Sequence, residues 1–203
     1  VLSETRNAWL GALAAILLFL SLISWRSMLT GLVSVVLLFF LLPVEFQDRF
    51  YSGLDTNDTT TQVRIELLRT GGRLIAANPV VGVGPRQIPE AAFANRTDDR
   101  FPQWAYQHLH NNYVQIAAEM GIPALLFWFA IWILITSDLL RMRRKNPVDS
   151  FSHCLATMGL CALAAFLVAG MFEYNFGDSE VAILFSFLAV SPFTGENGSG
   201  NET

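Results

Sequence analysis

Charged residues are scarce in this sequence. Asp, Glu, Lys and Arg make up 15% of its 203 residues, whereas hydrophobic residues make up 53%. Because a soluble globular domain carries about 25% charged residues, this shortage argues against a soluble protein. The charges that are present sum to −4, and they form no basic patch interleaved with aromatic side chains. We therefore expect no nucleic-acid partner.

Cysteine is equally scarce, and its placement argues against a disulfide. Cys154 and Cys161 are the two cysteines, and both lie in one apolar run. On a helix, seven residues separate their Cα atoms by about 10 Å, whereas a disulfide needs a separation below about 7 Å. We interpret both as small core residues, which say nothing about the redox compartment.

Long uncharged apolar runs are what the sequence has instead. Four runs each have 17 to 19 residues and occupy 8–24, 27–43, 121–137 and 154–172. That length is within the roughly 17–25 residues that span a bilayer. A shorter run at 181–190 is interpreted as a fifth span. The sequence therefore predicts an all-α fold, a polytopic membrane helical bundle of about five transmembrane helices with a large helical outer loop.

Basic residues in the short loops predict the orientation of these spans. Arg26 lies between the first two runs, and a basic cluster at 141–145 follows the third. Short loops rich in Lys and Arg stay on the cytoplasmic side, so the loop 44–120 is expected on the outer side. The expected segments are two transmembrane helices in 1–43, the outer loop in 44–120, two to three transmembrane helices in 121–193, and a disordered tail in 194–203.

The outer loop is too long for a simple connector, and loops of this length usually carry function. Its residues 61–77 have apolar side chains near helical spacing, which predicts an amphipathic helix on the membrane surface. Asn78-Pro79 ends this helix, and a glycine-rich turn follows at 82–86. The backbone N–H groups of such a turn could bind an anion. A plain helix stop followed by a turn explains the glycines as well.

Several arginines are candidate phosphate ligands. A guanidinium keeps its proton and binds phosphate through two hydrogen bonds, as a diphosphate leaving group would require. For Arg69 and Arg73 we favour the alternative that they pair with Glu66 or with lipid headgroups. The candidates on or near the predicted helix are Arg64, Arg69 and Arg73, and Arg6 and Arg86 are further candidates expected to lie close to them.

His108 and His110 form an H-x-H pair at the end of the loop. The loop contains no third Cys or His, so a zinc site would need carboxylates, and we predict no metal. Asn111 and Asn112 are good helix N-caps, which places His110 at a helix N-terminus, where the dipole favours the neutral ring. A neutral imidazole can accept a proton from a sugar hydroxyl. The alternative is a histidine that only hydrogen-bonds the loop.

Two carboxylates lie in the short outer segment 173–180 that precedes the fifth run. Glu173 and Asp178 face the same compartment as the outer loop in the predicted topology. They are candidates for contact with sugar hydroxyls, and the alternative is that they cap the fifth span.

Three motifs occur in a fixed order along the chain. They are Thr5-Arg6-Asn7-Ala8 at the start of the first span, Arg64 followed by N-P-V-V-G-V-G at 78–84, and His110-Asn111 followed after nine residues by Gly121. Together they resemble the O-antigen ligase/O-antigen polymerase family of bacterial inner-membrane glycosyltransferases. Thr and Asn stand where that family has the Ser and Gly of S-R-G-A, and Gly-Ile-Pro-Ala at 121–124 replaces its usual glycine pair.

The resemblance implies an enzyme that transfers an undecaprenyl-diphosphate-linked oligosaccharide to a sugar hydroxyl, on lipid A core or on a growing glycan. It implies a multi-pass protein of the bacterial inner membrane with a periplasmic active site and no cofactor. Family members have additional preceding spans, so we expect an N-terminal half as a partner.

The resemblance also implies roles for individual residues. Arg64, with Arg6, would grip the diphosphate, and His110 would orient or deprotonate the acceptor hydroxyl. Asn111 would hold that turn. Arg86 and Glu173 are further candidate substrate contacts.

Other functions share parts of this pattern. A protein O-oligosaccharyltransferase or an exopolysaccharide polymerase would share the donor and the chemistry and differ in the acceptor. A non-enzymatic membrane assembly protein would leave the placement of the arginine and the histidine without a role. A transporter would need ionisable residues inside its spans, and the four long runs contain none.

Overall fold

A computed structural model describes residues 5–52, 55 and 57–194, with residues 5–7, 49–50, 52 and 194 described by their backbone only. Every regular element in this part of the chain is helical. The α-helices are α1 (Thr5–Ile23), α2 (Trp25–Leu41), α3 (Val44–Ser52), α4 (Thr59–Ala77), α5 (Ile88–Ala94), α6 (Asn112–Met120), α7 (Ile122–Lys145), α8 (Phe151–Ala169) and α9 (Ser179–Val190). Short 3-10 turns are η1 (Gln103–Tyr106), η2 (Asn175–Gly177) and η3 (Ser191–Thr194).

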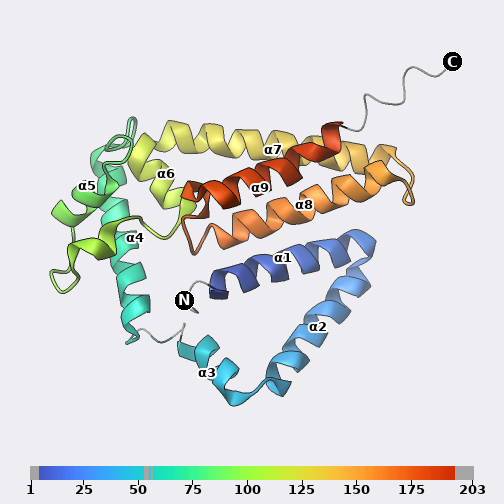
Figure 1. Ribbon diagram of the computed structural model, residues 1–203, viewed down its shortest axis with the longest axis horizontal. Coiled ribbons are helices and arrows are strands. Elements are labelled where there is room, and N and C mark those ends of the chain that lie inside the picture. The colour runs from blue at the N-terminus through green and yellow to red at the C-terminus, as the bar shows by residue number, and fades with distance from the viewer. Residues whose placement is uncertain (1–4, 53–54, 56, 195–203) are drawn as a thin grey trace.

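Four long helices, α1, α7, α8 and α9, lie side by side as a bundle, and α2 runs away from it at an angle (Figure 1). Aromatic side chains fill the bundle between α7, α8 and α9. Trp132, Phe166 and Phe185 are buried there, and the rings of Phe166 and Phe185 stack with centroids 3.9 Å apart. Helix α1 approaches α8 closely, because a Cβ at Gly11 would lie only 2.8 Å from the carbonyl oxygen of Ala165.

Two helices, α7 and α8, are long and apolar enough to cross a bilayer. Only 17% of the most apolar window of α7 and 33% of that of α8 is buried inside the protein, so neither is the core helix of a soluble domain. Large apolar side chains such as Phe127 and Leu134 face outward, as they do toward lipid. Shorter apolar helices cover 8–23, 25–41 and 179–193. The all-helical fold expected from the sequence is therefore confirmed and its apolar helices are consistent with a membrane protein, while the number of five spans stays a prediction.

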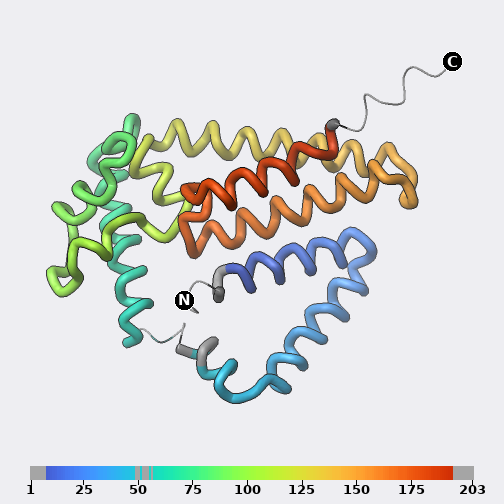
Figure 2. Tube along the Cα trace, viewed as in Figure 1, coloured from blue at the N-terminus to red at the C-terminus, as the bar shows by residue number. Residues whose placement is uncertain are grey.

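The basic end of α7 closes the bundle opposite to α4 and α6 (Figure 2). Arg143, Arg144 and Lys145 occupy the last turn of α7, where cations interact favourably with the helix dipole. The guanidinium of Arg143 donates a 2.7 Å hydrogen bond to the carbonyl of Leu22. This bond joins the ends of α1 and α7.

The segment from α4 to α6 forms a second core at the other end of the bundle (Figure 1). Helix α4 confirms the helix expected at 61–77 and begins two residues earlier, because Asp58 caps it by accepting from the amides of Thr60 and Thr61. Its apolar face is buried within the protein: Leu67 and Leu74 pack against α5, η1 and Leu109. The expectation that this face lies on the membrane surface is therefore wrong, because the loop folds over it. Thr194, the first residue of the predicted tail 194–203, ends η3, and the rest of that tail lies outside the described residues.

Candidate functional site

His110 occupies a turn immediately before α6. Its φ of +47° is in the left-handed region, which is uncommon for a non-glycine residue although histidine enters it more readily than most. Asn111 follows as the N-cap of α6, and its Oδ1 accepts from the amides of Tyr113 and Val114 at 2.9 Å each. The structure thus places His110 at the helix N-terminus that the two asparagines predict.

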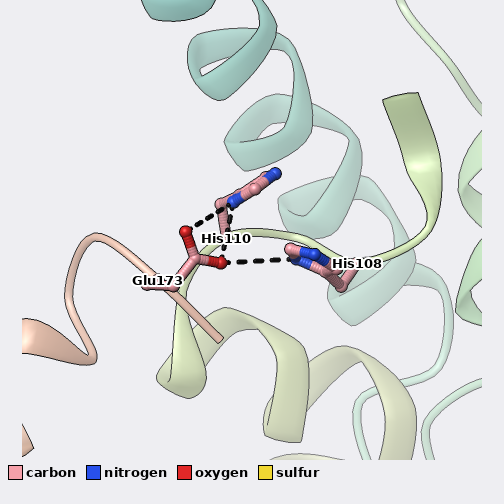
Figure 3. Close-up of side chains that lie close together, drawn as sticks. All are labelled: His108, His110 and Glu173. Carbon is pink, nitrogen blue, oxygen red and sulfur yellow. Dashed lines mark hydrogen bonds and ion pairs between the residues drawn. The ribbon is translucent and has the colours of Figure 1, made fainter. Parts of the chain in front are cut away.

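The carboxylate of Glu173 lies beside both histidine rings (Figure 3). Nδ1 of His110 is 2.8 Å from Oε1 and 3.0 Å from Oε2 of Glu173, and Nδ1 of His108 is 3.6 Å from Oε1. The ring centroids of the two histidines are 4.1 Å apart. Capping of α9 is done by Asp178, whose Oδ1 accepts from the amide of Glu180. Glu173 is therefore a partner of the histidines and not a helix cap.

The surroundings of these three groups set their charges. Burial raises the pKa of the Glu173 carboxyl, but the hydrogen bond and the charge of His110 and the amide of Tyr174 outweigh burial and lower it overall. Burial, together with the charge of His110, lowers the pKa of His108. At neutral pH, Glu173 is then ionised and His108 is neutral.

The ionised carboxylate determines which ring nitrogen of His110 carries a proton. A carboxylate can only accept hydrogen bonds, so Nδ1 of His110 is the donor in this contact. In the neutral form of the ring, the opposite nitrogen, Nε2, then has a lone pair that can accept a proton from a hydroxyl group. A carboxylate that orients a histidine in this way is the arrangement by which many hydrolases and transferases prepare a general base.

The same three side chains could also hold a metal ion. One ligand atom each from His108, His110 and Glu173 lies within 4.8 Å of the others. Two histidines and one carboxylate are a known ligand set for catalytic zinc, with a fourth position left open. Glu173 supplies the carboxylate that a zinc site at this histidine pair would need. The absence of a metal from the site therefore remains a prediction.

The arginines of α4 point to different sides of the helix. Gly71 faces the His110 turn, because a Cβ there would meet side chains of Leu109 and Val114 at 3.1 and 2.4 Å. Arg64 precedes Gly71 by seven residues, so it lies on the same stripe about two turns away. In the described part of the chain its half-buried side chain has no hydrogen-bond or ion-pair partner. Arg69 and Arg73 are exposed and lie roughly 140° and 180° around the helix from Arg64.

Glu66 is not a partner of these arginines. It is buried and accepts hydrogen bonds from the amide and hydroxyl of Thr97, from the hydroxyl of Thr70 and from the amide of Asp98. Burial raises its pKa, but these bonds lower it overall. Glu66 thus holds the loop after α5 onto α4 as an ionised, fully bonded carboxylate.

A hollow of about 300 Å³ lies on this other face of α4, lined by Gln62, Ile65, Glu66, Arg69, Asp98 and Arg100. Most of its charged side chains already have hydrogen-bond or ion-pair partners within the protein. The bonds to Thr97 and Thr70 occupy Glu66, and Asp98 forms a 2.6 Å ion pair with Arg100. The hollow is therefore a less suitable reaction site than the turn that contains His110, which has an orienting carboxylate.

The glycine-rich turn after α4 is a structural clasp. The amides of Val83 and Gly84 donate to the carbonyls of Ala118 and Glu119 at 2.8 and 3.0 Å, which caps the C-terminus of α6. Gly82 has φ +67°, and a Cβ there would lie 2.4 Å from the carbonyl of Glu119. These two amides are used within the protein, so the structure favours the plain turn over an anion site.

The second motif glycine completes the clasp. Gly121 has φ +90°, and a Cβ there would lie 2.1 Å from the carbonyl oxygen of Val80. The amide of Ile122 donates to the carbonyl of Pro79 at 2.8 Å. The backbone of the N-P-V-V-G-V-G segment and the backbone around Gly121 are therefore in direct contact, which leaves no room for a side chain at Gly82 or Gly121.

The remaining candidate arginines do not join His110 in the described structure. Arg86 donates its amide to Oε1 of Glu119 at 2.6 Å, and its side chain is exposed. Glu119 lies near the C-terminus of α6, about 10 Å along the helix from the end that carries His110. The backbone of Arg6 belongs to α1, and its side chain lies outside the described residues.

Comparison with known proteins gives one informative result. The curated proteins yield no match. A family model described as O-antigen ligase matches residues 1–129, which is more than half of the chain. This stretch contains Arg64, the clasp and His110, whereas Glu173 lies beyond it. The chain belongs to the O-antigen ligase family.

Proposed function

We propose that this protein transfers an undecaprenyl-diphosphate-linked glycan to a sugar hydroxyl at the turn that contains His110. The observation that carries the proposal is the contact between His110 and Glu173, 2.8 Å long, in a member of the O-antigen ligase family. The contact prepares a general base at a partly exposed position of a chain that has membrane-type helices. Lipid A core and a growing glycan chain are the acceptors proposed for it.

In the proposed reaction, the acceptor oxygen forms a bond to the anomeric carbon of the donor. The bond between that carbon and the diphosphate oxygen breaks, and the diphosphate leaves with the electron pair. The hydroxyl proton passes to Nε2 of His110, while Nδ1 keeps its proton in the hydrogen bond to Glu173. No other reactant is needed, because the donor supplies its own leaving group.

Arg64 is the residue proposed to stabilise the leaving diphosphate. It lies on the stripe of α4 that faces the His110 turn, and no acidic side chain of the described residues neutralises it. A guanidinium that is free of protein partners can bind phosphate oxygens as their charge develops. Arg6 is proposed as a second phosphate ligand from the start of α1.

The site is proposed to face the periplasm of a multi-pass inner-membrane protein. The basic turn Arg143–Lys145 ends α7 at one side of the bundle, and the turn with His110 lies near the start of α7 at the other side (Figure 1). Basic residues remain cytoplasmic, which leaves the α4–α6 segment outside. The polyprenyl chain of the donor would then lie along the exposed apolar surface of the bundle.

A cell-based assay of glycan ladders tests this function. A deletion strain would be complemented with the wild-type chain or with Arg64→Ala, His110→Ala or Arg69→Ala. We expect Arg64→Ala and His110→Ala to abolish the ladder and Arg69→Ala, on the far face of α4, to retain it. Wild-type ladders in the first two variants would refute the proposal. Glycan and glycoprotein profiles of the same strain would separate lipid, polysaccharide and protein acceptors.

A further inference from the structure

The two partners of the candidate base come from distant parts of the chain. His110 precedes α6, whereas Glu173 lies in the loop between α8 and η2, 63 residues later. No single helix contains both residues, so no helix fixes the distance between them. The 2.8 Å contact therefore depends on whatever holds the loop after α8 against the start of α6.

Asn112 makes most of the bonds that join these two segments, and Nδ2 of Asn111 adds one to the carbonyl of Met171 at 2.8 Å. Asn112 is the first residue of α6 and is fully buried. Its backbone N–H donates to the carbonyl of Gly170 at 2.8 Å. Its side-chain Oδ1 accepts from the amide of Phe176 at 3.0 Å, and its Nδ2 donates to Oδ1 of Asn175. Asn112 is thus bonded to the loop on both sides of Glu173.

These bonds are not explained by helix capping. Asn111 already caps α6 through its Oδ1, so the side chain of Asn112 serves no amide of its own helix. The fit around it is also close, because a Cβ at Gly170 would lie 2.3 Å from Nδ2 of Asn112. A buried amide with both polar atoms bonded to one loop fixes that loop in one position.

We propose that Asn112 is a positioning residue that holds Glu173 against Nδ1 of His110, and so keeps His110 ready to accept a proton. The inference rests on the proposed function, since it assigns Asn112 to the same reaction. Asn112 does not touch the substrate in this account. It acts through Glu173, so its loss should have the same consequence as the loss of the carboxylate.

A double-mutant cycle in purified full-length protein distinguishes this role from a general packing role. Transfer rates are compared for wild type, Asn112→Ala, Glu173→Gln and the double variant. We expect Asn112→Ala to lower kcat about tenfold or more with the donor KM within twofold. The double variant should be no slower than Glu173→Gln alone, because the contact is then already lost. Independent effects that multiply would overturn the proposal.

A spectroscopic measurement does not depend on activity. The ring nitrogens of ¹⁵N-labelled His110 report whether Nδ1 donates to a carboxylate, and His110→Ala assigns the signal. We expect Asn112→Ala to shift these signals as Glu173→Gln does, while Asn95→Ala, a change at an exposed helix end, leaves them at the wild-type positions. Wild-type signals in Asn112→Ala would refute the positioning role.

The proposal can still be tested if Asn112→Ala does not fold or if the wild-type protein is inactive. If Asn112→Ala does not fold, Asn175→Ala removes only the acceptor of Nδ2 and should shift the His110 signals in the same direction by a smaller amount. An unchanged spectrum in Asn175→Ala would then count against the proposal. An inactive wild-type protein would refute the proposed function, whereas the nitrogen signals would still decide whether Asn112 positions Glu173.

Discussion

The carboxylate of Glu173 accepts a 2.8 Å hydrogen bond from Nδ1 of His110 across 63 residues of sequence. The bond joins the histidine motif at the start of α6 to the loop after α8, and it fixes which ring nitrogen is free for chemistry. A family motif that ends at Gly121 gives no hint of this partner. In the proposed mechanism, the reactivity of His110 therefore depends on a residue that the family match, 1–129, does not include.

Removing the carboxylate charge should slow transfer without preventing folding. Glu173→Gln keeps the size of the side chain but can no longer stabilise a protonated imidazole. We expect a loss of transfer rate of about 10²-fold, the lower end of the contribution of general base catalysis. The matched control is Glu180→Gln in the exposed first turn of α9, which should retain the wild-type rate. Equal rates in both variants would show that Glu173 has no part in the reaction.

Stability should depend on pH through His108 and Glu173. The pKa of His108 is lowered from 6.5 by burial and by the charge of His110, so the unfolded chain binds more protons at this position than the folded protein as pH falls through 6.5. The unfolding temperature should therefore fall below about pH 6.5. His108→Gln should flatten this part of the curve when unfolding is followed by circular dichroism between pH 8 and pH 5.

Glu173 adds a second loss at lower pH. Its folded pKa lies below the ordinary 4.5, so its contribution is complete above the unfolded value and disappears as pH falls through the folded one. Glu173→Gln should remove this step and leave the step near pH 6.5 in place. A wild-type curve that is flat from pH 8 to pH 4 would contradict both assignments.

Chelation should not stop transfer if the site works by proton transfer alone. His108, His110 and Glu173 could bind a divalent ion, and such an ion would compete with the hydrogen bond between His110 and Glu173 that the proposed reaction needs. We expect the rate of protein dialysed against EDTA to equal that of untreated protein, and added Zn²⁺ to inhibit. Loss of activity on chelation with recovery on Zn²⁺ would show that the cluster is a metal centre.

The glycine clasp should be sensitive to a single methyl group. Gly82→Ala would force a left-handed φ on alanine, which costs about 1–2 kcal/mol, and would overpack the backbone of Glu119, which costs about 1–3 kcal/mol more. Gly72→Ala is the control, because a Cβ at this exposed helix position meets nothing within 4 Å. It should stabilise the protein by about 0.5–1 kcal/mol. Chemical denaturation of both variants in detergent measures the difference.

Local signals in the sequence predict much of this structure. The cap Asn111 indicates where α6 begins, and the apolar spacing of 61–77 predicts α4 except for its first two residues. Helices α1, α2, α7 and α8 overlap the four long apolar runs. These features are predictable because each depends on residues within a few positions of one another.

Other features depend on tertiary contacts and leave no local signal. Asn112 looks like a second helix cap in the sequence, and only the folded loop reveals that its side chain bonds to Asn175 and Phe176. The glycines of the clasp indicate a turn, but not that its amides are bonded to α6. Helical spacing does separate Arg64 from Arg73, yet it cannot say which side faces His110.

Transfer in vitro from a polyprenyl diphosphate-linked oligosaccharide tests the central claim most directly. Wild-type protein and His110→Ala are purified in detergent, and released polyprenyl diphosphate and lengthened acceptor are measured together. We expect both products from the wild type in equal amounts and neither from His110→Ala at more than about one hundredth of that rate, in line with the loss of a general base. Equal transfer by the two proteins would contradict the assignment of His110 as the base.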